Sequence, residues 1–257
     1  MIYLKTEEEI ELLRQSTMIV CETLAEMAKI IRPGVSTAYL DKIAEEYMRD
    51  NGAIPACKGY NGYPATLCTS VNDQVVHGIP SEKAILREGD IISVDTCALK
   101  NGFVGDSAYT FAVGKISDDV RQLLDVTKQS LFLGIEKAVH GNRIGDIANA
   151  VQQHCEAHGY SVVREMVGHG IGRNMHEAPE VPNYGRRGVG PLLKEGMTIC
   201  IEPMINMGKR DLIFERDGWT TRTIDGKPSA HYENAVAVAK GQPVILSDFS
   251  IIEAQLH

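Results

Sequence analysis

The sequence has no long apolar run and a deficit of positive charge. None of its hydrophobic stretches approaches the roughly 20 consecutive residues that a membrane-spanning helix needs, so we expect no membrane partner. Lysine and arginine total 26 against 34 aspartates and glutamates, which gives a formal net charge of −8. A chain of this charge lacks the cationic face that binds nucleic acid backbones. Nucleic acid is therefore not an expected partner.

Cysteine is sparse, and the sequence contains no C-x-x-C pair. Six cysteines are scattered along a chain that is long enough to fold around a hydrophobic core without disulfide bonds. The first nine residues are acidic, whereas a secretory signal starts with basic residues and continues with an apolar stretch. We therefore expect a cytoplasmic protein whose cysteines are reduced thiols.

Two amphipathic helices are predicted at the start of the chain. Thr6 and Glu9 have the spacing of a capping box, and apolar residues then recur at helical spacing as far as the Arg-Pro-Gly segment 32–34. A second helix is predicted from about Ser36 to the Asn-Gly pair 51–52. Both helices have counterparts later in the sequence.

The second half of the chain repeats the pattern of the first. When the sequence is shifted so that Gly34 falls on Gly141, the two predicted helices fall on a later helical pattern that ends at Gly159. The same shift aligns residues 87–95 with 194–202, and each of these segments is a charged turn, a β-rich strand and then a carboxylate. A strand that agrees at the same shift as the helices favours a true internal repeat over chance similarity.

The repeat predicts an α/β protein with two pseudo-symmetric halves. No Pro/Gly/Ser-rich linker separates the halves, which are about residues 1–117 and 118–257. Independent domains are normally joined by such a linker. We therefore expect one domain over residues 1–257, in which the two halves share a sheet system.

A predicted β-hairpin brings two aspartates onto one face of this sheet. Asn101-Gly102 is a strong signal for a two-residue type I′ turn, and it follows a β-rich segment that contains Asp95. Pairing Lys100 with Phe103 across the turn makes Asp95 and Asp106 diagonal neighbours, about 7–8 Å apart at the backbone. Two bare carboxylates repel one another there unless a cation lies between them. The hairpin therefore predicts a metal site.

Two further acids and several histidines are candidates for the same site. Glu202 and Glu233 are predicted to lie within apolar strands, where an unpaired ionised carboxylate is too costly to bury. His169 lies among glycines, and His77 and His176 occur in similar loop-like segments. Taken singly, each acid can face solvent or pair with arginine, and each histidine can be an ordinary loop residue. As a set, they favour a metal centre.

The donor types indicate the metal and its chemistry. Carboxylates with one or two imidazoles and no thiolate pair favour Mn(II), Fe(II), Co(II) or Zn(II) over a cysteine-bound structural zinc. A carboxylate that bridges metal ions implies a site with two ions. Two ions about 3.5–4 Å apart lower the pKa of a water that bridges them and polarise a carbonyl group. Hydrolysis of an acyl bond and of a phosphoryl bond both fit this donor set.

The ligand order Asp, Asp, His, Glu, Glu resembles that of the dinuclear peptidases of the pita-bread fold. That group includes the methionine aminopeptidases, aminopeptidase P and prolidase. The similarity is strongest to type 1 methionine aminopeptidases, and it extends over essentially the whole chain. Glu202 and Glu233 are too close in sequence to leave room for the long insertion that is typical of type 2 enzymes. The matching segments are Val-His-Gly-Ile-Pro (76–80), Gly-His-Gly-Ile-Gly (168–172), Ile-Glu-Pro-Met (201–204) and Tyr-Glu-Asn-Ala (232–235).

The resemblance implies a role for each ligand. Asp95 is expected to chelate one divalent metal ion, Asp106 and Glu233 to bridge two, and His169 with Glu202 to complete the second. In the family's mechanism a metal-bridging hydroxide attacks the scissile carbonyl, and the glutamate at position 202 moves the proton.

Other implied site residues contact the substrate. His77 and His176 are expected to be catalytic without binding metal, because in the family they contact the substrate amide and the developing oxyanion. Met175 departs from the phenylalanine that is common there in bacterial members. A monovalent-cation site is implied at Asn72 and Ser229. The expected side-chain pocket is lined by Cys57, Tyr60, Tyr63, Cys68, Met175 and Trp219.

The implied activity is removal of the initiator methionine from nascent proteins whose second residue is small. The implied partners are the N-terminal peptides of nascent proteins and the ribosome, and the expected state is a cytoplasmic monomer. Two alternatives remain: an X-Pro peptidase of the same fold, and a peptide-binding module that has lost catalysis. All five ligand types are present, which argues against the second.

Overall fold

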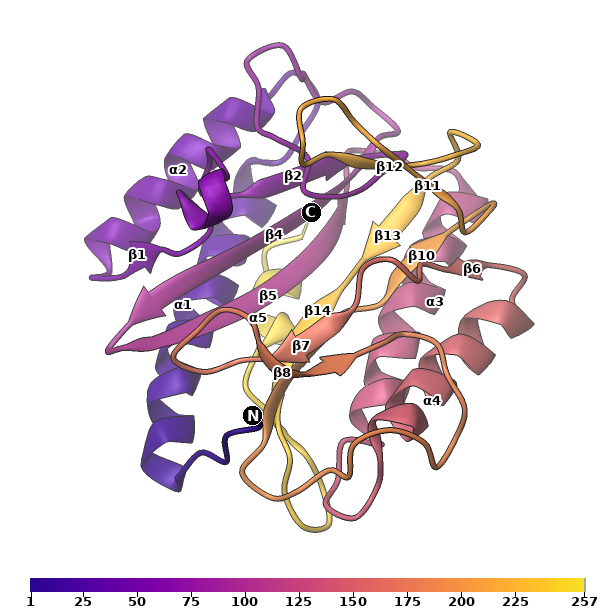
Figure 1. Cartoon of the computed structure of the whole chain (residues 1–257). Coiled ribbons are helices and arrows are strands. Elements are labelled where there is room, and N and C mark those ends of the chain that lie inside the picture. Colours follow the sequence, from indigo (N-terminus) through magenta and orange to yellow (C-terminus); the bar gives the residue numbers. More distant parts are fainter. Residues whose placement is uncertain (257) are drawn as a thin grey trace.

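The computed structural model describes residues 1–256 and consists of a large curved sheet, two small sheets and the helices that cover them (Figure 1). The helices are α1 (Glu7–Ile30), α2 (Thr37–Asp50), η1 (Tyr60–Gly62), α3 (Asp118–Ile135), α4 (Ile144–Ala157) and α5 (Phe249–Glu253). The strands of the first half are β1 (Ile54–Pro55), β2 (Cys68–Val71), β3 (Gln74–Val76), β4 (Ile91–Lys100) and β5 (Phe103–Ala112). Those of the second half are β6 (Ser161–Val162), β7 (Gly168–Gly170), β8 (Glu177–Val181), β9 (Thr198–Ile201), β10 (Met204–Asn206), β11 (Leu212–Phe214), β12 (Thr221–Thr223), β13 (Ser229–His231), β14 (Glu233–Ala237) and β15 (Val244–Ile245).

Both halves of the chain contribute strands to the large sheet, and every pairing in it is antiparallel. Its main path runs β1-β4-β5-β14-β9-β7-β8, with β2 paired to β4 and β15 paired to β14. Helix α1 packs against β4 and β5, whereas α3 packs against β9, β10 and β14 (Figure 1). The predicted α/β class is confirmed. None of the helices within residues 1–256 is long and apolar enough to cross a membrane.

The predicted internal repeat is visible in the element bounds. The shift that places Gly34 on Gly141 also places α2 on α4 with the same first and last positions, and it places the start of β4 on the start of β9. The predicted capping box is also present, since the Glu9 amide donates to Thr6 Oγ1 and the Thr6 amide donates to Glu9 Oε2, both at 3.2 Å. Local sequence signals therefore determine both the ends of the helices and their repetition.

The β4–β5 hairpin has the predicted register. Lys100 pairs with Phe103 across the turn, and Cys97 pairs with Asp106. The two turn residues have φ values of 53° and 78°, as a type I′ turn requires. Because side chains alternate between faces of a strand, this register puts Asp95 and Asp106 on the same face.

The prediction that Glu202 lies within a strand is wrong. Strand β9 ends at Ile201 and β10 starts at Met204, so Glu202 lies in the break between them. The residue that follows is Pro203, which has no amide hydrogen to donate to a strand ladder. The register of β9 with β14, extended by one residue, places Glu202 opposite Glu233, and both side chains line the same cavity as Asp106.

Helix α1 approaches β5 so closely that only glycine fits at one position. A Cβ added at Gly105 would overlap the backbone of Ser16 and Thr17. Backbone atoms cannot move aside as the end of a side chain can, so this glycine sets the distance between the helix and the sheet.

We predict that Gly105→Ala destabilises the protein by about 3 kcal/mol or more, because the added methyl overpacks a rigid contact. Gly134→Ala in α3 is the matched control, since the added methyl there meets side-chain methyls of Val151, Ile147 and Ile201. Urea unfolding monitored by circular dichroism measures both changes. Equal loss of unfolding free energy in the two variants would contradict this account of the contact.

Candidate metal centre

Five consecutive strands of the large sheet each bring one predicted ligand to the same cavity. In the strand order β4, β5, β14, β9 and β7, the ligands are Asp95, Asp106, Glu233, Glu202 just beyond β9, and His169. All five line a cavity of about 250 Å³. The curvature and register of one sheet therefore gather residues that are far apart in sequence.

His169 presents a free ring nitrogen to the acids. Its Nδ1 lies 2.9 Å from the Gly170 carbonyl oxygen, which fixes the hydrogen on Nδ1. Nε2 lies 3.5 Å from Glu202 Oε1 and 3.8 Å from Asp106 Oδ2. Burial, with a smaller effect of His176, lowers the pKa of His169 to about 4. The ring is therefore neutral at physiological pH, which is the state that binds a metal.

The acids are held in an environment that opposes their charge. Burial raises the pKa of Asp95 to about 7, and burial together with Asp95 raises the pKa of Asp106 well above its usual value. The pKa values of Glu202 and Glu233 are also raised, first by burial and then by the other acids. Within residues 1–256, Asp106 and Glu202 have only histidines at ion-pair distance, and Asp95 and Glu233 have no ion-pair partner. The cluster therefore lacks the lysine or arginine that normally neutralises buried carboxylates.

Two buried carboxylate oxygens have no hydrogen-bond partner. These atoms are Asp106 Oδ1 and Glu233 Oε1, and each belongs to a buried side chain. Buried polar atoms are almost always satisfied, so orphaned carboxylate oxygens beside an imidazole indicate a cation-binding site. The donor set of four carboxylates and one neutral imidazole fits divalent transition metals.

Cys200 lies at the centre of this cluster, and the sequence did not predict it. Donor atoms of Asp106, His169, Cys200 and Glu233 all lie within 4.8 Å of one another. Burial, with contributions from Glu233, Asp106 and Glu202, raises the pKa of Cys200 well above its usual value, so its thiol is neutral. Cys200 lies two residues before Glu202, and this strand alternation was the one signal that would have found it.

The two histidines expected to act without binding metal lie at the same cavity. His176 stacks edge-on against His169 with ring centroids 4.3 Å apart, and its Nδ1 lies 2.7 Å from the Tyr60 hydroxyl. His77 has a φ of 59°, which is rare for a residue with a side chain. Burial, with a contribution from His176, lowers the pKa of His77 to about 4. Burial also lowers the pKa of His176, so both rings are neutral near pH 7.

His231 is a second residue that the sequence did not predict. Its ring is buried, and neither ring nitrogen has a hydrogen-bond partner among the described residues. Nε2 lies 3.8 Å from Glu202 Oε2. Burial, with a contribution from His77, lowers the pKa of His231 to about 3. No periodicity or motif distinguished this histidine from the other residues of β13.

The residues expected to form the side-chain pocket all line the cavity beside the acids. They are Cys57, Tyr60, Tyr63, Cys68, Met175 and Trp219, and Met166 and Met204 line it as well. Tyr63 donates from its hydroxyl to the Leu67 carbonyl at 2.9 Å, and its ring packs edge-on against Trp219 with centroids 5.1 Å apart. All six cysteines of the chain are buried free thiols, as expected.

A buried ion pair fastens the start of the chain to the segment that carries His176. Lys5 Nζ lies 2.6 Å from Glu177 Oε2, and both side chains are 6% exposed. Glu177 Oε1 also accepts from the Asn174 amide, so this carboxylate spans the turn before His176. A Cβ at Gly172 would crowd this pair, which explains the glycine there.

The two residues expected at a monovalent-cation site are adjacent. The Ser229 amide donates to the Asn72 carbonyl oxygen at 2.9 Å. Asn72 Oδ1 accepts from the Ile91 amide, and the Ser229 hydroxyl lies within hydrogen-bond distance of Ile205 and Asn206. Their side-chain oxygens are therefore already engaged within the fold.

The fold and the site have clear relatives among known proteins. The profile described as metallopeptidase family M24 matches residues 11–240. The methionine aminopeptidase of Clostridium acetobutylicum is 52% identical over 247 residues, which cover 96% of this chain and 99% of the relative. The crystal structure of methionine aminopeptidase from Rickettsia prowazekii superposes with a TM-score of 0.95 at 39% identity, and the match covers 96% of this chain and 100% of that one.

The chain therefore belongs to metallopeptidase family M24. Within that family it is an enzyme of the bacterial methionine aminopeptidase type, with the pita-bread fold. X-Pro peptidases share the fold alone: an Xaa-Pro dipeptidase from Bacillus anthracis has a TM-score of 0.75 at 23% identity, with 95% of this chain matching 62% of that one. The comparisons thus support neither the X-Pro alternative nor the inactive binding module.

The raised pKa values predict how stability depends on pH when no metal is bound. The ordinary pKa of such an acid in the unfolded chain is near 4, whereas its pKa in the folded protein is higher, about 7 for Asp95. The acid contributes stability below the unfolded-state pKa. This contribution is lost as the pH rises through the folded-state pKa. The buried histidines act in the opposite direction, but their contribution changes only on the acid side of neutrality. Metal-free protein should therefore become less stable as the pH rises above neutrality.

Divalent metal should remove this loss, because it binds the deprotonated acids. We predict that manganese(II) raises the melting temperature more at about pH 8 than at about pH 6, by a difference on the order of 5 °C. Thermal melts with manganese and with chelator at each pH measure the effect. An equal gain at both values would mean that the acids are not charged in the metal-bound state.

Proposed function

We propose that this enzyme uses two divalent ions to remove the initiator methionine from nascent proteins whose second residue is small. The observation that carries the proposal is the convergence of four buried or partly buried carboxylates and His169 in a pocket with soft, apolar walls. Cobalt, manganese, iron and zinc all suit this donor set. We further propose that the enzyme acts as a monomer in the cytoplasm, where nascent chains emerge from the ribosome.

The arrangement of the donors supports two ions. His169 Nε2 is closer to Glu202 than to Asp106, which suits a shared ion for His169 and Glu202. Asp106 and Glu233 lie on the central strands and have orphaned oxygens, as bridging carboxylates require. Asp95, on the outer strand of the five, would complete the other ion. When bound, the two ions would supply a nucleophilic water at neutral pH and polarise the scissile carbonyl.

The chain's own residues would bind and orient the substrate. The Tyr60 hydroxyl can donate to His176 Nδ1, which leaves Nε2–H as a donor toward the substrate. His77 is neutral and contributes a second donor on the same cavity wall. Two such donors would stabilise the developing oxyanion, and Glu202 would move the proton toward the leaving amine.

The pocket walls suit a thioether. Tyr60, Tyr63 and Trp219 provide aromatic faces and edges, and Cys57 and Cys68 provide thiols. Sulfur in a methionine side chain makes favourable contacts with such groups. The cavity volume of about 250 Å³ suits a single side chain of the substrate. Met175, in place of the common phenylalanine, would give this rim a more flexible surface.

Two finer parts of the proposal concern ions and partners. A monovalent cation would contact backbone oxygens near Asn72 and Ser229, because the side-chain oxygens there are engaged. The partner would be the N-terminal peptide of a nascent protein at the ribosome. The net charge of −8 argues against direct binding to nucleic acid.

Release of methionine from a Met-Ala-Ser peptide tests the activity. We expect turnover by manganese-loaded protein, loss of turnover after chelation, and recovery when metal is restored. An Ala-Pro peptide should not be cleaved, and Met-Leu-Ser should be cleaved far more slowly than Met-Ala-Ser. Cleavage that is insensitive to chelation, or faster cleavage of Ala-Pro, would refute the proposal.

Asp106→Ala tests bridging. The substitution removes a carboxylate that both ions would share but removes little apolar contact, so the protein should fold. We expect at least a 100-fold loss of metal affinity, since even residues that only support a ligand typically cost about 10–100-fold. Calorimetric manganese titration and methionine release measure the loss, with exposed Asp50→Ala as the control. Normal metal stoichiometry and turnover in Asp106→Ala would contradict bridging.

A further inference from the structure

The only tryptophan of the chain lies in a hairpin loop at the edge of the cavity. Strands β11 and β12 pair antiparallel, and residues 215–220 join them. Strand β12 also pairs with β3, which leads directly into His77. The Trp219 ring packs edge-on against Tyr63 and against His77, with centroids 5.1 Å and 6.1 Å away. The position of this loop therefore sets one wall of the cavity, which Trp219 lines together with Tyr63 and His77.

Apolar packing holds this hairpin only in part, through Leu212 and Trp219. In the outer strand β11, Ile213 is 45% exposed and Phe214 is 60% exposed. The pairing of β12 with β3 is short and has an irregularity between Thr221 and Arg222. A short, exposed hairpin of this kind opens easily unless polar contacts fasten it.

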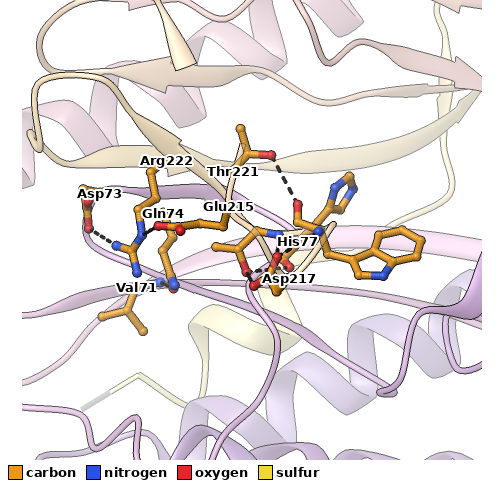
Figure 2. Close-up of polar contacts among 10 residues, drawn as sticks. Val71, Asp73, Gln74, His77, Glu215, Asp217, Thr221 and Arg222 are labelled. Carbon is orange, nitrogen blue, oxygen red and sulfur yellow. Dashed lines mark hydrogen bonds and ion pairs between the residues drawn. The ribbon is translucent and has the colours of Figure 1, made fainter. Parts of the chain in front are cut away.

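Asp217 closes the loop through three hydrogen bonds. Its Oδ1 accepts from the Trp219 amide at 2.9 Å and from the Thr220 amide at 2.8 Å, and its Oδ2 accepts from the Thr220 hydroxyl at 2.6 Å. The Thr220 hydroxyl also lies 3.5 Å from the His77 carbonyl oxygen. Figure 2 shows these contacts converging between the loop and His77. One carboxylate thus fixes the backbone on both sides of the Trp219 side chain.

Arg222 fastens the base of the same hairpin to a distant turn. Its Nε donates to Glu215 Oε1 and its Nη1 donates to Asp73 Oδ1, both at 2.7 Å (Figure 2). Glu215 starts the hairpin loop, and Asp73 lies in the turn between β2 and β3. The three side chains are 28–39% exposed, so the contact lies at the surface and not in the core. The planar fork of arginine presents separate donors to these two partners in a fixed geometry.

We propose that Asp217 and Arg222 are positioning residues that set how strictly the pocket selects the first side chain of the substrate. They do so by holding Trp219 against Tyr63 and His77, and neither touches the substrate. A loop that opens would enlarge the pocket and weaken its contacts with methionine, while the acids of the metal centre stay in place. The inference rests on the proposed function in one respect, namely that this cavity receives the first side chain.

Asp217→Ala and Asp217→Asn test the loop contact as a pair. Alanine removes all three hydrogen bonds, whereas asparagine keeps the oxygen that accepts from both amides. For Asp217→Ala we expect a rise in KM of about tenfold and a fall in the preference for methionine over leucine of about tenfold, with kcat nearly unchanged. Asparagine should restore both values. The matched control is Asp211→Ala, an exposed acid on the same hairpin.

Fluorescence gives a readout that does not depend on catalysis. Because Trp219 is the only tryptophan, the emission spectrum and acrylamide quenching report on this wall alone. Asp217→Ala should shift the emission to longer wavelength and increase quenching, and Asp217→Asn should resemble the original protein. Arg222→Met should cause a smaller change of the same kind, with Arg210→Met as its control because Arg210 pairs only with its neighbour.

Each outcome decides the proposal. Unchanged fluorescence and unchanged methionine preference in Asp217→Ala would overturn it, as would equal effects in the Asp211 control. If Asp217→Ala fails to fold, Arg222→Met must still show the fluorescence change and the loss of preference, or the proposal fails. If Asp217→Ala changes the fluorescence but the original protein never releases methionine, the proposed function is refuted and the positioning of Trp219 is still supported.

Discussion

The structure depends on one constraint, the electrostatic repulsion among the carboxylates of the metal centre. Four carboxylates meet in a cavity with three buried or partly buried histidines and no lysine or arginine paired to the acids in residues 1–256. Burial and mutual repulsion raise the pKa values of the acids, and burial lowers those of the histidines. The folded chain therefore spends stability on a site that only protons or bound cations can neutralise. A cluster of acids with raised pKa values beside neutral histidines is typical of a binding site for highly charged cations.

The sheet is the device that creates this site. Five neighbouring strands contribute one ligand each, and the antiparallel register turns every ligand toward the same face. Strands near the middle of the sheet are rigid, so donors placed there keep their separation when metal binds. The pocket walls, by contrast, come from loops and a short helix, namely the 57–68 segment, the 173–177 turn and the 215–220 hairpin loop. Polar contacts such as the buried ion pair of Lys5 with Glu177 hold these walls in place.

Local signals in the sequence were enough to predict much of this arrangement. The Asn101-Gly102 turn determined the register of β4 and β5, and with it the shared face of Asp95 and Asp106. The capping box at Thr6 and the internal repeat predicted the helices and their correspondence between the two halves. The prediction that Glu202 lies within a strand was wrong, because the chain leaves β9 before Glu202 and Pro203 prevents the strand from continuing. Cys200 and His231 were missed because their importance comes from neighbours on other strands, and the pairing of Lys5 with Glu177 joins positions 172 residues apart.

Diffraction from crystals of the manganese-loaded protein, recorded near the metal absorption edge, tests the central claim most directly. Our account predicts two anomalous peaks inside the ring formed by Asp95, Asp106, His169, Glu202 and Glu233, with Asp106 and Glu233 in contact with both. Acids that point away from one another, with no anomalous peak among them, would contradict it.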